Sequence, residues 1–341
     1  MGGVVLDVAI LGAGFMGATH AAGWRAFGPR ARVRWVSSRS GEKAARVAEG
    51  VAAQPTTDLF APIDDPGVLA VDVCLPTFLH REACERAFAA GKHVLLEKPI
   101  ALRREDADAI LTAAERSGRV LVVGLVLRFF AEYVEIERRV RARAFGRPLA
   151  VSTYRLSPPV DWNDWMRDPA RSGGPAVDLL VHDFDQMNWL LGRPRQVFAR
   201  APALEGKDPG HIHSLVEYDG AQGVAEGGLV MPRSYPFSAG IRVLCERGVI
   251  EHGFRAGPSE AGGNIGGSMN RFLRLHPATG PSETIRVQEF DPWAAEIAYF
   301  AECVEQGRPP GRGTAGQARD ALSVSLAVNR SLRSGRPEPV G

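Results

Sequence analysis

Short apolar runs alternate with helically spaced segments over the first third of the chain. Five runs are brief, rich in Val, Leu and Ile and bounded by turn residues, which is typical of strands buried on both faces. They cover residues 6–11, 33–37, 71–75, 93–97 and 120–124. The segments between them repeat apolar residues at the helical period and predict helices at residues 15–27, 42–49, 81–90 and 105–117. This alternation predicts an α/β fold, a parallel doubly wound Rossmann sheet over a domain of residues 1–124.

The pattern changes after Gly124. A helix is expected over residues 131–145, because Gly146 and Pro148 form a stop signal. Strand-like segments follow at residues 149–156, 196–200, 212–218, 223–230, 239–245, 249–253, 271–276 and 284–287. Turn pairs such as Asp219–Gly220 favour an antiparallel sheet, and further helices are expected at residues 178–191, 293–305 and 315–334. Residues 125–341 are therefore predicted to form an α+β domain with a large, mostly antiparallel open sheet.

Composition narrows the class of protein. A length of 341 residues suits two domains, and a net charge of +2 gives no basic field for nucleic acid or an acidic membrane. No apolar run reaches the roughly 18 residues of a membrane span. The four cysteines are widely spaced and form no C-x-x-C pair, which argues against a zinc site or a disulfide framework. We expect a cytoplasmic protein that binds neither nucleic acid nor membrane.

Gly12, Gly14 and Gly17 form the pattern G-x-G-x-x-G where the first strand meets the first helix. The first glycine permits a tight turn, the second lets backbone approach a pyrophosphate, and the third lets the helix pack closely. The helix N-terminus then offers N–H groups and partial positive charge to the phosphates. The motif predicts dinucleotide binding by these glycines and by Phe15 and Met16 between them.

The end of the second predicted strand indicates which dinucleotide. An acidic residue that holds the ribose 2′-hydroxyl of NAD is expected about 20 residues after the glycines. The chain instead has Ser37, Ser38 and Arg39, whose hydroxyls and guanidinium suit a 2′-phosphate. We therefore predict NADP(H) as the preferred cofactor, with NAD(H) as the alternative if Arg39 is only a solvated loop residue.

The segment from Gly91 to Glu97-Lys98-Pro99 resembles the Gfo/Idh/MocA family of oxidoreductases, which carries Glu-Lys-Pro at the end of its fifth Rossmann strand. Further landmarks of that family occur in order over nearly the whole chain: His20, Leu75-Pro76-Thr77-Phe78-Leu79-His80, Gly124-x-x-x-Arg128-Phe129 and Gly173-Gly174-x-x-x-Asp178-x-x-x-His182-Asp183-x-Asp185. The resemblance implies a two-domain enzyme whose C-terminal sheet often builds a dimer or tetramer interface. It also implies that Leu75, Pro76, Thr77, His80, Glu97 and Lys98 contact the cofactor.

Lys98, Asp178 and His182 are the candidate catalytic residues. Oxidation of an alcohol needs a group that takes the hydroxyl proton, and His182 suits this because imidazole titrates near neutrality. Asp178 precedes it by four residues on the same predicted helix, where it would orient the ring. The Lys98 ammonium follows a strand end and would stabilise the developing alkoxide. The alternatives without a catalytic role are an ion pair of Lys98 with Glu97, a helix-capping role for Asp178 and a buried structural role for His182.

Other positions are candidates for substrate contact. Asp185 follows His182 by three, and the resemblance places a substrate contact there. Asn163 and Trp165 lie in a predicted loop, where an amide and an indole would suit a sugar, although a packed surface loop would look the same. Arg128 contacts either the substrate or the domain junction. His211 and His213 share a strand face, but no metal site is expected there, and His20 and His80 are expected to be packed rather than reactive.

Together these features predict an NAD(P)-dependent oxidoreductase that acts on a secondary hydroxyl or ketone of a sugar, an inositol or a related polyol. A homodimer or homotetramer through the C-terminal sheet is expected from the resemblance. Two other functions stay open: redox-neutral glycoside hydrolysis with tightly held NAD, and a dinucleotide-binding sensor without chemistry. The presence of Lys98, Asp178 and His182 together speaks against the sensor.

Overall fold

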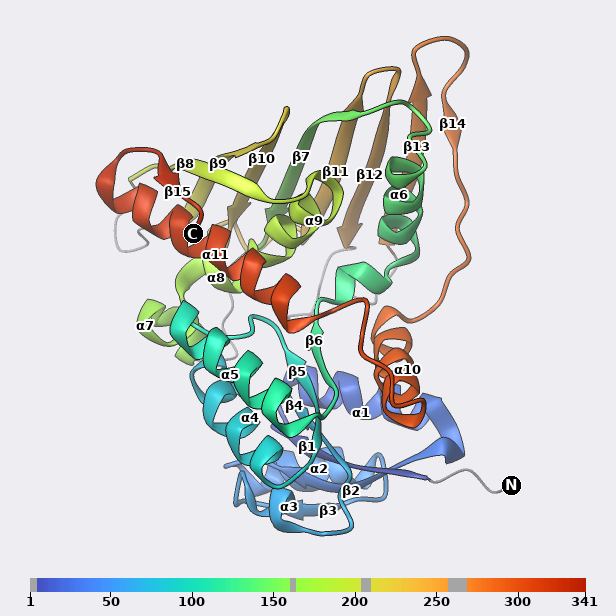
Figure 1. Ribbon diagram of the computed structural model, residues 1–341, viewed down its shortest axis with the longest axis vertical. Coiled ribbons are helices and arrows are strands. Elements are labelled where there is room, and N and C mark those ends of the chain that lie inside the picture. The colour runs from blue at the N-terminus through green and yellow to red at the C-terminus, as the bar shows by residue number, and fades with distance from the viewer. Residues whose placement is uncertain (1–4, 160–163, 204–209, 257–268) are drawn as a thin grey trace. The chain divides into compact units, whose positions relative to one another are not determined.

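The computed structural model describes residues 5–159, 164–203, 210–256 and 269–341. The chain forms two compact units, which Figure 1 draws together. Unit 1 holds Met1–Phe130 and Glu289–Arg319, and unit 2 holds Ala131–Gln288 and Asp320–Gly341. Among the described helices, none is long and apolar enough to cross a membrane.

Unit 1 is built on a six-stranded sheet in the order β3-β2-β1-β4-β5-β6. Its strands are β1 Leu6–Leu11, β2 Ala31–Ser37, β3 Gln54–Thr56, β4 Ala70–Val73, β5 His93–Glu97 and β6 Leu121–Gly124. All of their pairings are parallel. This order reverses between β1 and β4, as in a Rossmann sheet, so the predicted fold is confirmed.

The helices of unit 1 follow the predicted pattern. They are α1 Phe15–Phe27, α2 Gly41–Glu49, α3 Ala61–Asp64, α4 His80–Ala89, α5 Arg104–Ser117 and α10 Pro292–Glu305, with short 3₁₀ turns η1 Gly28–Arg30, η2 Thr77–Leu79 and η3 Val126–Phe129. Val8, Val71 and Leu95 in the central strands are fully buried, because the helices cover the parallel sheet. The sheet therefore presents its loops, rather than its faces, to solvent.

Helix α10 belongs to unit 1 although it follows residue 124, after which every residue was predicted to belong to the second domain; that boundary stays a prediction. Unit 1 extends to Phe130 and also includes the segment that carries α10. The reason is packing against α1: a Cβ on Gly23 would lie 2.5 Å from Cδ1 of Ile297, so the glycine allows the helices to approach closely. Trp24 and Phe300 meet edge to face with ring centroids 6.2 Å apart.

Unit 2 holds a nine-stranded sheet in the order β14-β13-β12-β11-β7-β10-β9-β8-β15 (Figure 1). Its strands are β7 Pro148–Leu156, β8 Pro194–Arg200, β9 His211–Tyr218, β10 Ala221–Gly228, β11 Ser238–Cys245, β12 Gly248–Ala256, β13 Met269–Pro277, β14 Glu283–Thr284 and β15 Glu338–Pro339. Only the pairing of β7 with β10 is parallel among these described strands. The predicted, mostly antiparallel sheet is confirmed.

The other elements of unit 2 are α6 Ala131–Arg141, η4 Asp164–Arg167, α7 Pro169–Ser172, α8 Gly174–Asp178, α9 Val181–Leu191 and most of α11 Ala315–Ser334. The prediction of one helix over residues 178–191 is wrong, because α8 ends at Asp178 and α9 begins at Val181. The N–H groups of Leu179 and Leu180 both donate to the carbonyl of Pro175, which closes α8. Leu180 then accepts the N–H groups of Asp183 and Phe184 and starts α9.

Candidate active site

The three glycines after β1 differ in whether the fold has room for a side chain at their position. Gly12 has a φ of +108°, and a Cβ there would lie 2.5 Å from the carbonyl oxygen of Cys74. A Cβ on Gly17 would collide with the carbonyl oxygen of Gly12. A Cβ on Gly14 would meet nothing within 4 Å. The fold itself therefore needs Gly12 and Gly17, whereas Gly14 leaves open space in front of the backbone.

That open space lies at the N-terminus of a 13-residue helix. Gly14 is the N-cap of α1 and makes no side-chain cap hydrogen bond. Helix N-termini attract anions through unpaired N–H groups and the aligned peptide dipoles. The turn therefore fits a dinucleotide pyrophosphate, with Gly14, Phe15 and Met16 as the backbone that would hold it.

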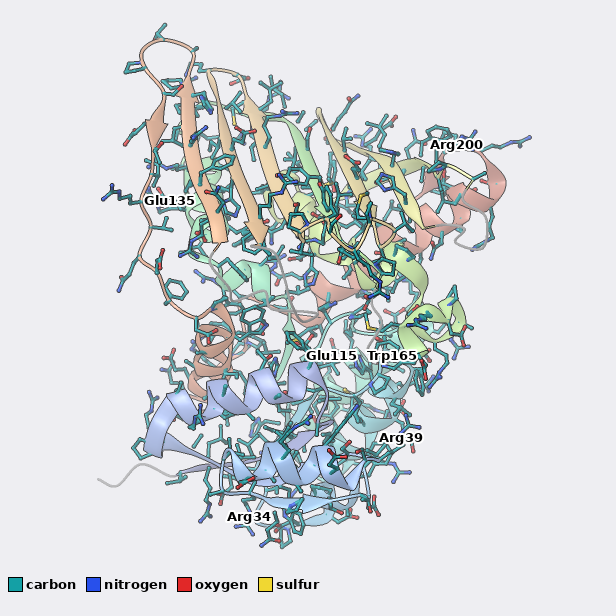
Figure 2. All side chains as sticks on the ribbon, turned by 180° about the vertical axis from the view of Figure 1, so that it is seen from behind. Arg34, Arg39, Glu115, Glu135, Trp165 and Arg200 are labelled. Atoms are coloured by element: carbon teal, nitrogen blue, oxygen red, sulfur yellow. The ribbon has the colours of Figure 1, made fainter. Side chains whose placement is uncertain are left out.

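The residues at the end of β2 and just after it differ in their exposure and hydrogen bonding. Ser37 is buried, and its Oγ donates to the carbonyl of Leu59 at 3.0 Å. The Oγ of Ser38 accepts the N–H of Ser40 at 3.3 Å. Arg39 is exposed, as Figure 2 shows. Arg39 is thus the predicted ribose-end residue whose charged group lies at the surface, while the Ser37 hydroxyl is already engaged.

The loop after β4 contains the predicted cofactor contacts Leu75, Pro76, Thr77 and His80. Thr77 and His80 are buried, with His80 only 1% exposed. The Nε2 of His80 lies 2.8 Å from the carbonyl oxygen of Leu75, and its Nδ1 lies 2.9 Å from that of Pro99. His80 therefore joins the loop after β4 to the loop after β5, in agreement with the expected packed role.

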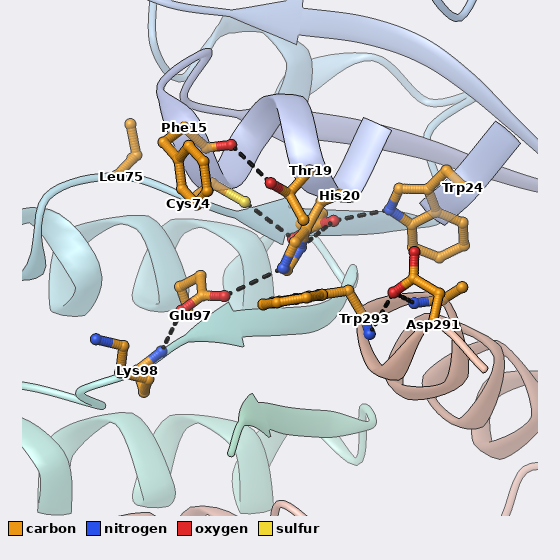
Figure 3. A network of polar contacts seen from close by, with 12 residues as sticks. Phe15, Thr19, His20, Trp24, Cys74, Leu75, Glu97, Lys98, Asp291 and Trp293 are labelled. Carbon is orange, nitrogen blue, oxygen red and sulfur yellow. Dashed lines mark hydrogen bonds and ion pairs between the residues drawn. The ribbon is translucent and has the colours of Figure 1, made fainter. Parts of the chain in front are cut away.

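Lys98 follows β5 directly and is tied to the side chain that precedes it. Glu97 is 5% exposed, and its Oε2 accepts the backbone N–H of Lys98 at 3.0 Å. Its other oxygen, Oε1, lies 3.1 Å from Nε2 of His20. Figure 3 shows the Lys98 side chain directed away from this contact. The Glu97 carboxylate thus faces inward, and its predicted contact with the cofactor stays a prediction.

His20 lies between two carboxylates in the interior of unit 1. Its Nδ1 is 2.9 Å from both carboxylate oxygens of Asp72. Trp24 donates its indole N–H to Asp72 Oδ2 at 2.7 Å (Figure 3). Burial is the largest single influence and lowers the pKa of His20, but the charges and hydrogen bonds of Asp72 and Cys74 together outweigh it and raise this pKa well above its ordinary value. His20 is therefore packed, as predicted, but as part of a charged network.

The acidic groups around His20 were not predicted from the sequence. Asp72 is a single acid inside the apolar run of β4 and is fully buried. Glu296 on α10 is also fully buried, and neither of its carboxyl oxygens has a hydrogen-bond partner among the described residues. Burial and the charge of Glu97 hold the pKa of Glu296 well above its ordinary value. The available signal was an acidic residue at a core position of a strand or helix.

In unit 2, Asp178 is the last residue of α8 and is buried, and His182 lies in the first turn of α9 and is half-buried. Asp185, further along α9, is also buried. The backbone of Leu179 and Leu180 between them stays in the right-handed helical region. The two catalytic candidates of unit 2 are therefore held on consecutive short helices rather than on one helix.

A buried ion pair anchors the helix that carries His182. Arg155 on β7 donates from Nε to Oδ2 of Asp183 at 2.7 Å and from Nη2 to Oδ1 at 3.4 Å. Both side chains are less than a tenth exposed. Burial raises the pKa of Asp183, and Arg155 opposes that rise. Such a pair fixes α9 on the sheet. It was not predicted, because no motif in the sequence links Arg155 on β7 to Asp183 on α9.

The remaining candidates are dispersed. Arg128 is 2% exposed within η3 of unit 1. Trp165 lies half-buried in η4 of unit 2 (Figure 2), and Asn163 falls outside the described residues. Lys98 belongs to unit 1, whereas Asp178, His182 and Asp185 belong to unit 2. The roles of these residues stay predictions.

Within the part of the chain that the structure describes, two groups of side chains have spacing that would permit a metal ion. One is His20, Asp72 and Cys74, which already form the buried network. The other is His211, His213 and Glu226, whose ligand atoms lie within 4.8 Å of one another. His211 Nε2 lies 3.1 Å from Glu226 Oε1, which accounts for the closeness of that pair. The prediction that the protein carries no metal site stays as it was.

Comparison with known proteins decides the family. Residues 6–125 match the model of an oxidoreductase family with an NAD-binding Rossmann fold, and residues 133–251 match the GFO/IDH/MocA C-terminal domain. A myo-inositol dehydrogenase of Streptomyces leeuwenhoekii is 32% identical over 97% of this chain and 98% of its own length. The chain belongs to the Gfo/Idh/MocA family of oxidoreductases. The predicted resemblance is confirmed.

Other members of the Gfo/Idh/MocA family are similar along their whole length. The NAD(+)-dependent scyllo-inositol 2-dehydrogenase of Bacillus subtilis is 26% identical over 96% of this chain and 94% of that protein. The crystal structure of an aldose-aldose oxidoreductase from Caulobacter crescentus, complexed with glycerol, has 26% identity and a TM-score of 0.83 over 98% of this chain and 100% of that one. The protein is thus an NAD(P)-binding oxidoreductase of the class that acts on CH–OH groups.

Proposed function

We propose that the protein transfers hydride reversibly between NADP(H) and a secondary hydroxyl of a sugar, an inositol or a related polyol. The observation that carries the proposal is the position of Lys98 at the carboxyl end of β5, in the same parallel sheet as the open glycine turn after β1. Parallel sheets of this kind bind ligands at the carboxyl ends of their strands, where the strand order reverses. The inositol and aldose oxidoreductases among the relatives support the substrate class.

The chain's residues divide the work on the substrate oxygen. When bound, the nicotinamide accepts or supplies the hydride. The Lys98 ammonium donates to the substrate oxygen and stabilises the negative charge that develops there. His182 takes the hydroxyl proton during oxidation and returns it during reduction, and Asp178 holds its protonated ring. We also propose Asp185, Asn163, Trp165 and Arg128 as substrate contacts.

The preference for NADP(H) is part of the proposal. Residues 37–40 contain no acid, and the exposed guanidinium of Arg39 suits a 2′-phosphate. Comparison of NADP and NAD binding by calorimetry tests it. Equal or tighter binding of NAD would overturn the preference and leave the oxidoreductase activity unaffected.

Substitution of the proposed catalytic groups tests the chemistry. A panel of inositols, aldoses and amino-polyols is screened by nicotinamide absorbance, and Lys98→Met and His182→Ala are measured on the best substrate. We expect kcat to fall at least about 100-fold in each variant, because removal of a positioned acid–base group has effects of that size. Binding of NADP should be retained. Unchanged turnover in either variant would refute the assigned role.

The same screen separates the two other functions. Cleavage of a glycoside without net change in nicotinamide absorbance would indicate a redox-neutral hydrolase. A protein that turns over no polyol, and whose Lys98→Met and His182→Ala variants keep their function in cells, would be a sensor. Net reduction of NADP by a polyol excludes both.

We further propose self-association, as a homodimer or homotetramer, through one face of the sheet of unit 2. Tyr154, Leu215, Val224 and Leu244 are between 37% and 45% exposed on β7, β9, β10 and β11. Val224 pairs directly with Leu215, so their side chains share a face. Sedimentation of wild type and Leu215→Arg tests this: a monomeric wild type would refute it. The four cysteines are free thiols, which suits the proposed cytoplasmic location.

A further inference from the structure

The network around His20 connects to the proposed catalytic lysine through its backbone. Starting at Lys98, the N–H donates to Glu97 Oε2, and Glu97 Oε1 lies 3.1 Å from His20 Nε2. His20 Nδ1 then lies 2.9 Å from the Asp72 carboxylate. Three elements that are far apart in sequence, α1, β4 and β5, thus meet at one imidazole (Figure 3). The chain of contacts ends at the residue that the proposed function places on the substrate.

The geometry determines the protonation of His20. Both ring nitrogens face carboxylate oxygens, which only accept hydrogen bonds when ionised. With both carboxylates ionised, each nitrogen carries a hydrogen and the ring is an imidazolium, which is the direction in which the raised pKa of His20 points. The groups that face it are Asp72, Glu97, the Cys74 thiol beside Asp72, and Glu296 from α10. A cation in this position compensates the two ionised carboxylates, which would otherwise be buried without a counter-charge.

Glu97 has few alternatives for its orientation. Its side chain is 7% exposed, and a Cβ on its sheet neighbour Gly124 would lie 3.3 Å from its Oε1. One of its oxygens is taken by His20 and the other by the backbone N–H of Lys98. The carboxylate is therefore fixed at both ends within a closely packed space.

We propose that His20 and Glu97 are positioning residues for Lys98: the imidazolium fixes the Glu97 carboxylate, and the carboxylate fixes the backbone from which the Lys98 side chain extends. This inference rests on the proposed role of Lys98. Neither residue is assigned contact with the substrate. Because a displacement of about 1 Å at a reacting group can cost about 100-fold in rate, loss of the clamp should lower kcat.

Two substitutions of His20 form a matched pair. His20→Gln and His20→Asn both remove the buried positive charge. The longer Gln side chain carries its N–H₂ donor near the position of Nε2, within reach of Glu97, whereas Asn carries it near Nδ1, within reach of Asp72 only. The difference between the variants therefore reports the contact with Glu97 rather than the charge. Val94→Ala, which shortens a fully buried side chain on the same strand β5, controls for loss of stability.

We expect kcat for the polyol to be at least about tenfold lower in His20→Asn than in His20→Gln. The KM for the polyol and the Kd of NADP should each differ by less than about twofold between the two variants. Val94→Ala should lower the Tm and keep the wild-type kcat. Equal kcat values for the Asn and Gln variants would overturn the proposal, as would a kcat that follows Tm across all three variants.

A second substitution keeps the proposal testable if the His20 variants do not fold. Glu97→Gln leaves one acceptor oxygen for two donors and should lower kcat, measured at saturating NADP, at least about tenfold. Wild-type kcat in this variant would overturn the proposal. Failure of the proposed function is seen separately: there, Lys98→Met itself would keep its turnover, whereas failure of the positioning role leaves Lys98→Met inactive.

Discussion

Glu296→Gln should make the protein more stable, by an amount that grows with pH. Glu296 is fully buried on α10, and no residue that the structure describes forms a hydrogen bond with either carboxyl oxygen. Burial and the nearby charge of Glu97 raise its pKa well above the ordinary value of 4.5. The folded protein therefore holds this carboxyl as the neutral acid, whereas the unfolded chain releases the proton near 4.5. A glutamine in the same place is neutral in both states.

The magnitude follows from proton linkage. Below 4.5, both states carry the proton and the substitution has no pH-dependent effect. Between 4.5 and the native pKa, the folded state binds one more proton than the unfolded state, so the wild-type free energy of unfolding falls by about 1.4 kcal/mol per pH unit. The advantage of the variant rises by the same amount. With a urea m-value of about 1–3 kcal/mol/M, each pH unit separates the midpoints by about 0.5–1.4 M.

Urea unfolding of wild type and Glu296→Gln at several pH values above 4.5 measures this difference. Other titrating groups are shared by the two proteins and cancel. Glu302→Gln, on the same helix with 43% of the side chain exposed, controls for the same chemical change in solvent, and its profile is subtracted. A difference that stays flat from 4.5 upward would refute the conclusion that Glu296 is a neutral acid in the folded protein.

Three further predictions address the cofactor site and the anchor of α9. Gly14→Val should weaken NADP binding at least about tenfold with little change in Tm, because a Cβ at this position meets no atom of the described residues within 4 Å. Gly17→Ala should lower the Tm, because its Cβ would collide with the carbonyl oxygen of Gly12. Calorimetry and thermal unfolding distinguish the two variants, and equal losses of Tm would contradict the assignment. Arg39→Ala should raise the Kd of NADP about tenfold, the equivalent of about 1.4 kcal/mol, and leave that of NAD within about twofold; parallel losses for both would show that Arg39 does not contact the 2′-phosphate. Arg155→Met should lower the free energy of unfolding by about 3–5 kcal/mol, since it leaves Asp183 buried without its partner, and adding Asp183→Leu should restore part of that loss; no recovery in the double variant would contradict the ion-pair explanation.

The sequence predicted the elements well where a periodic apolar face defines them. The bounds of α1 and α11 agree with the prediction, because buried residues recur at the helical period along each helix, as far as Trp24 in α1 and Ser331 in α11. β3 was missed, since Gln54–Thr56 has three residues, contains a proline and lies at the sheet edge with no buried face. The break between α8 and α9 was missed because the apolar period continues through Leu179 and Leu180, and only the double acceptance by the Pro175 carbonyl shows it.

Long-range packing explains why α10 belongs to unit 1. The sequence order places α10 after the strands of unit 2, so a prediction along the chain assigns it there. Its apolar stripe would fit either sheet. What decides is the close approach at Gly23, where a missing Cβ makes room for Ile297, and a glycine inside a helix does not reveal which distant side chain it accommodates.

The catalytic candidates were predictable from motifs. The buried charged residues behind Lys98 were visible in the sequence only as ionisable residues at positions where the apolar pattern predicts a hydrophobic one. His20, Asp72, Glu97 and Glu296 all occupy core positions: His20 belongs to the buried stripe of α1, Glu296 to that of α10, and the two others to buried strands. In the hydrophobic pattern of the sequence, each of them looks like a single polar residue within the apolar face of its own helix or strand. A buried ionisable group is tolerated only if it is paired with an opposite charge or is neutral. Several such groups in one core must therefore pair with one another or take their neutral form. In this chain Asp72 and Glu97 pair with the His20 imidazolium, and Glu296 is held as the neutral acid. The substitutions at His20 test the first arrangement, and the substitution at Glu296 tests the second.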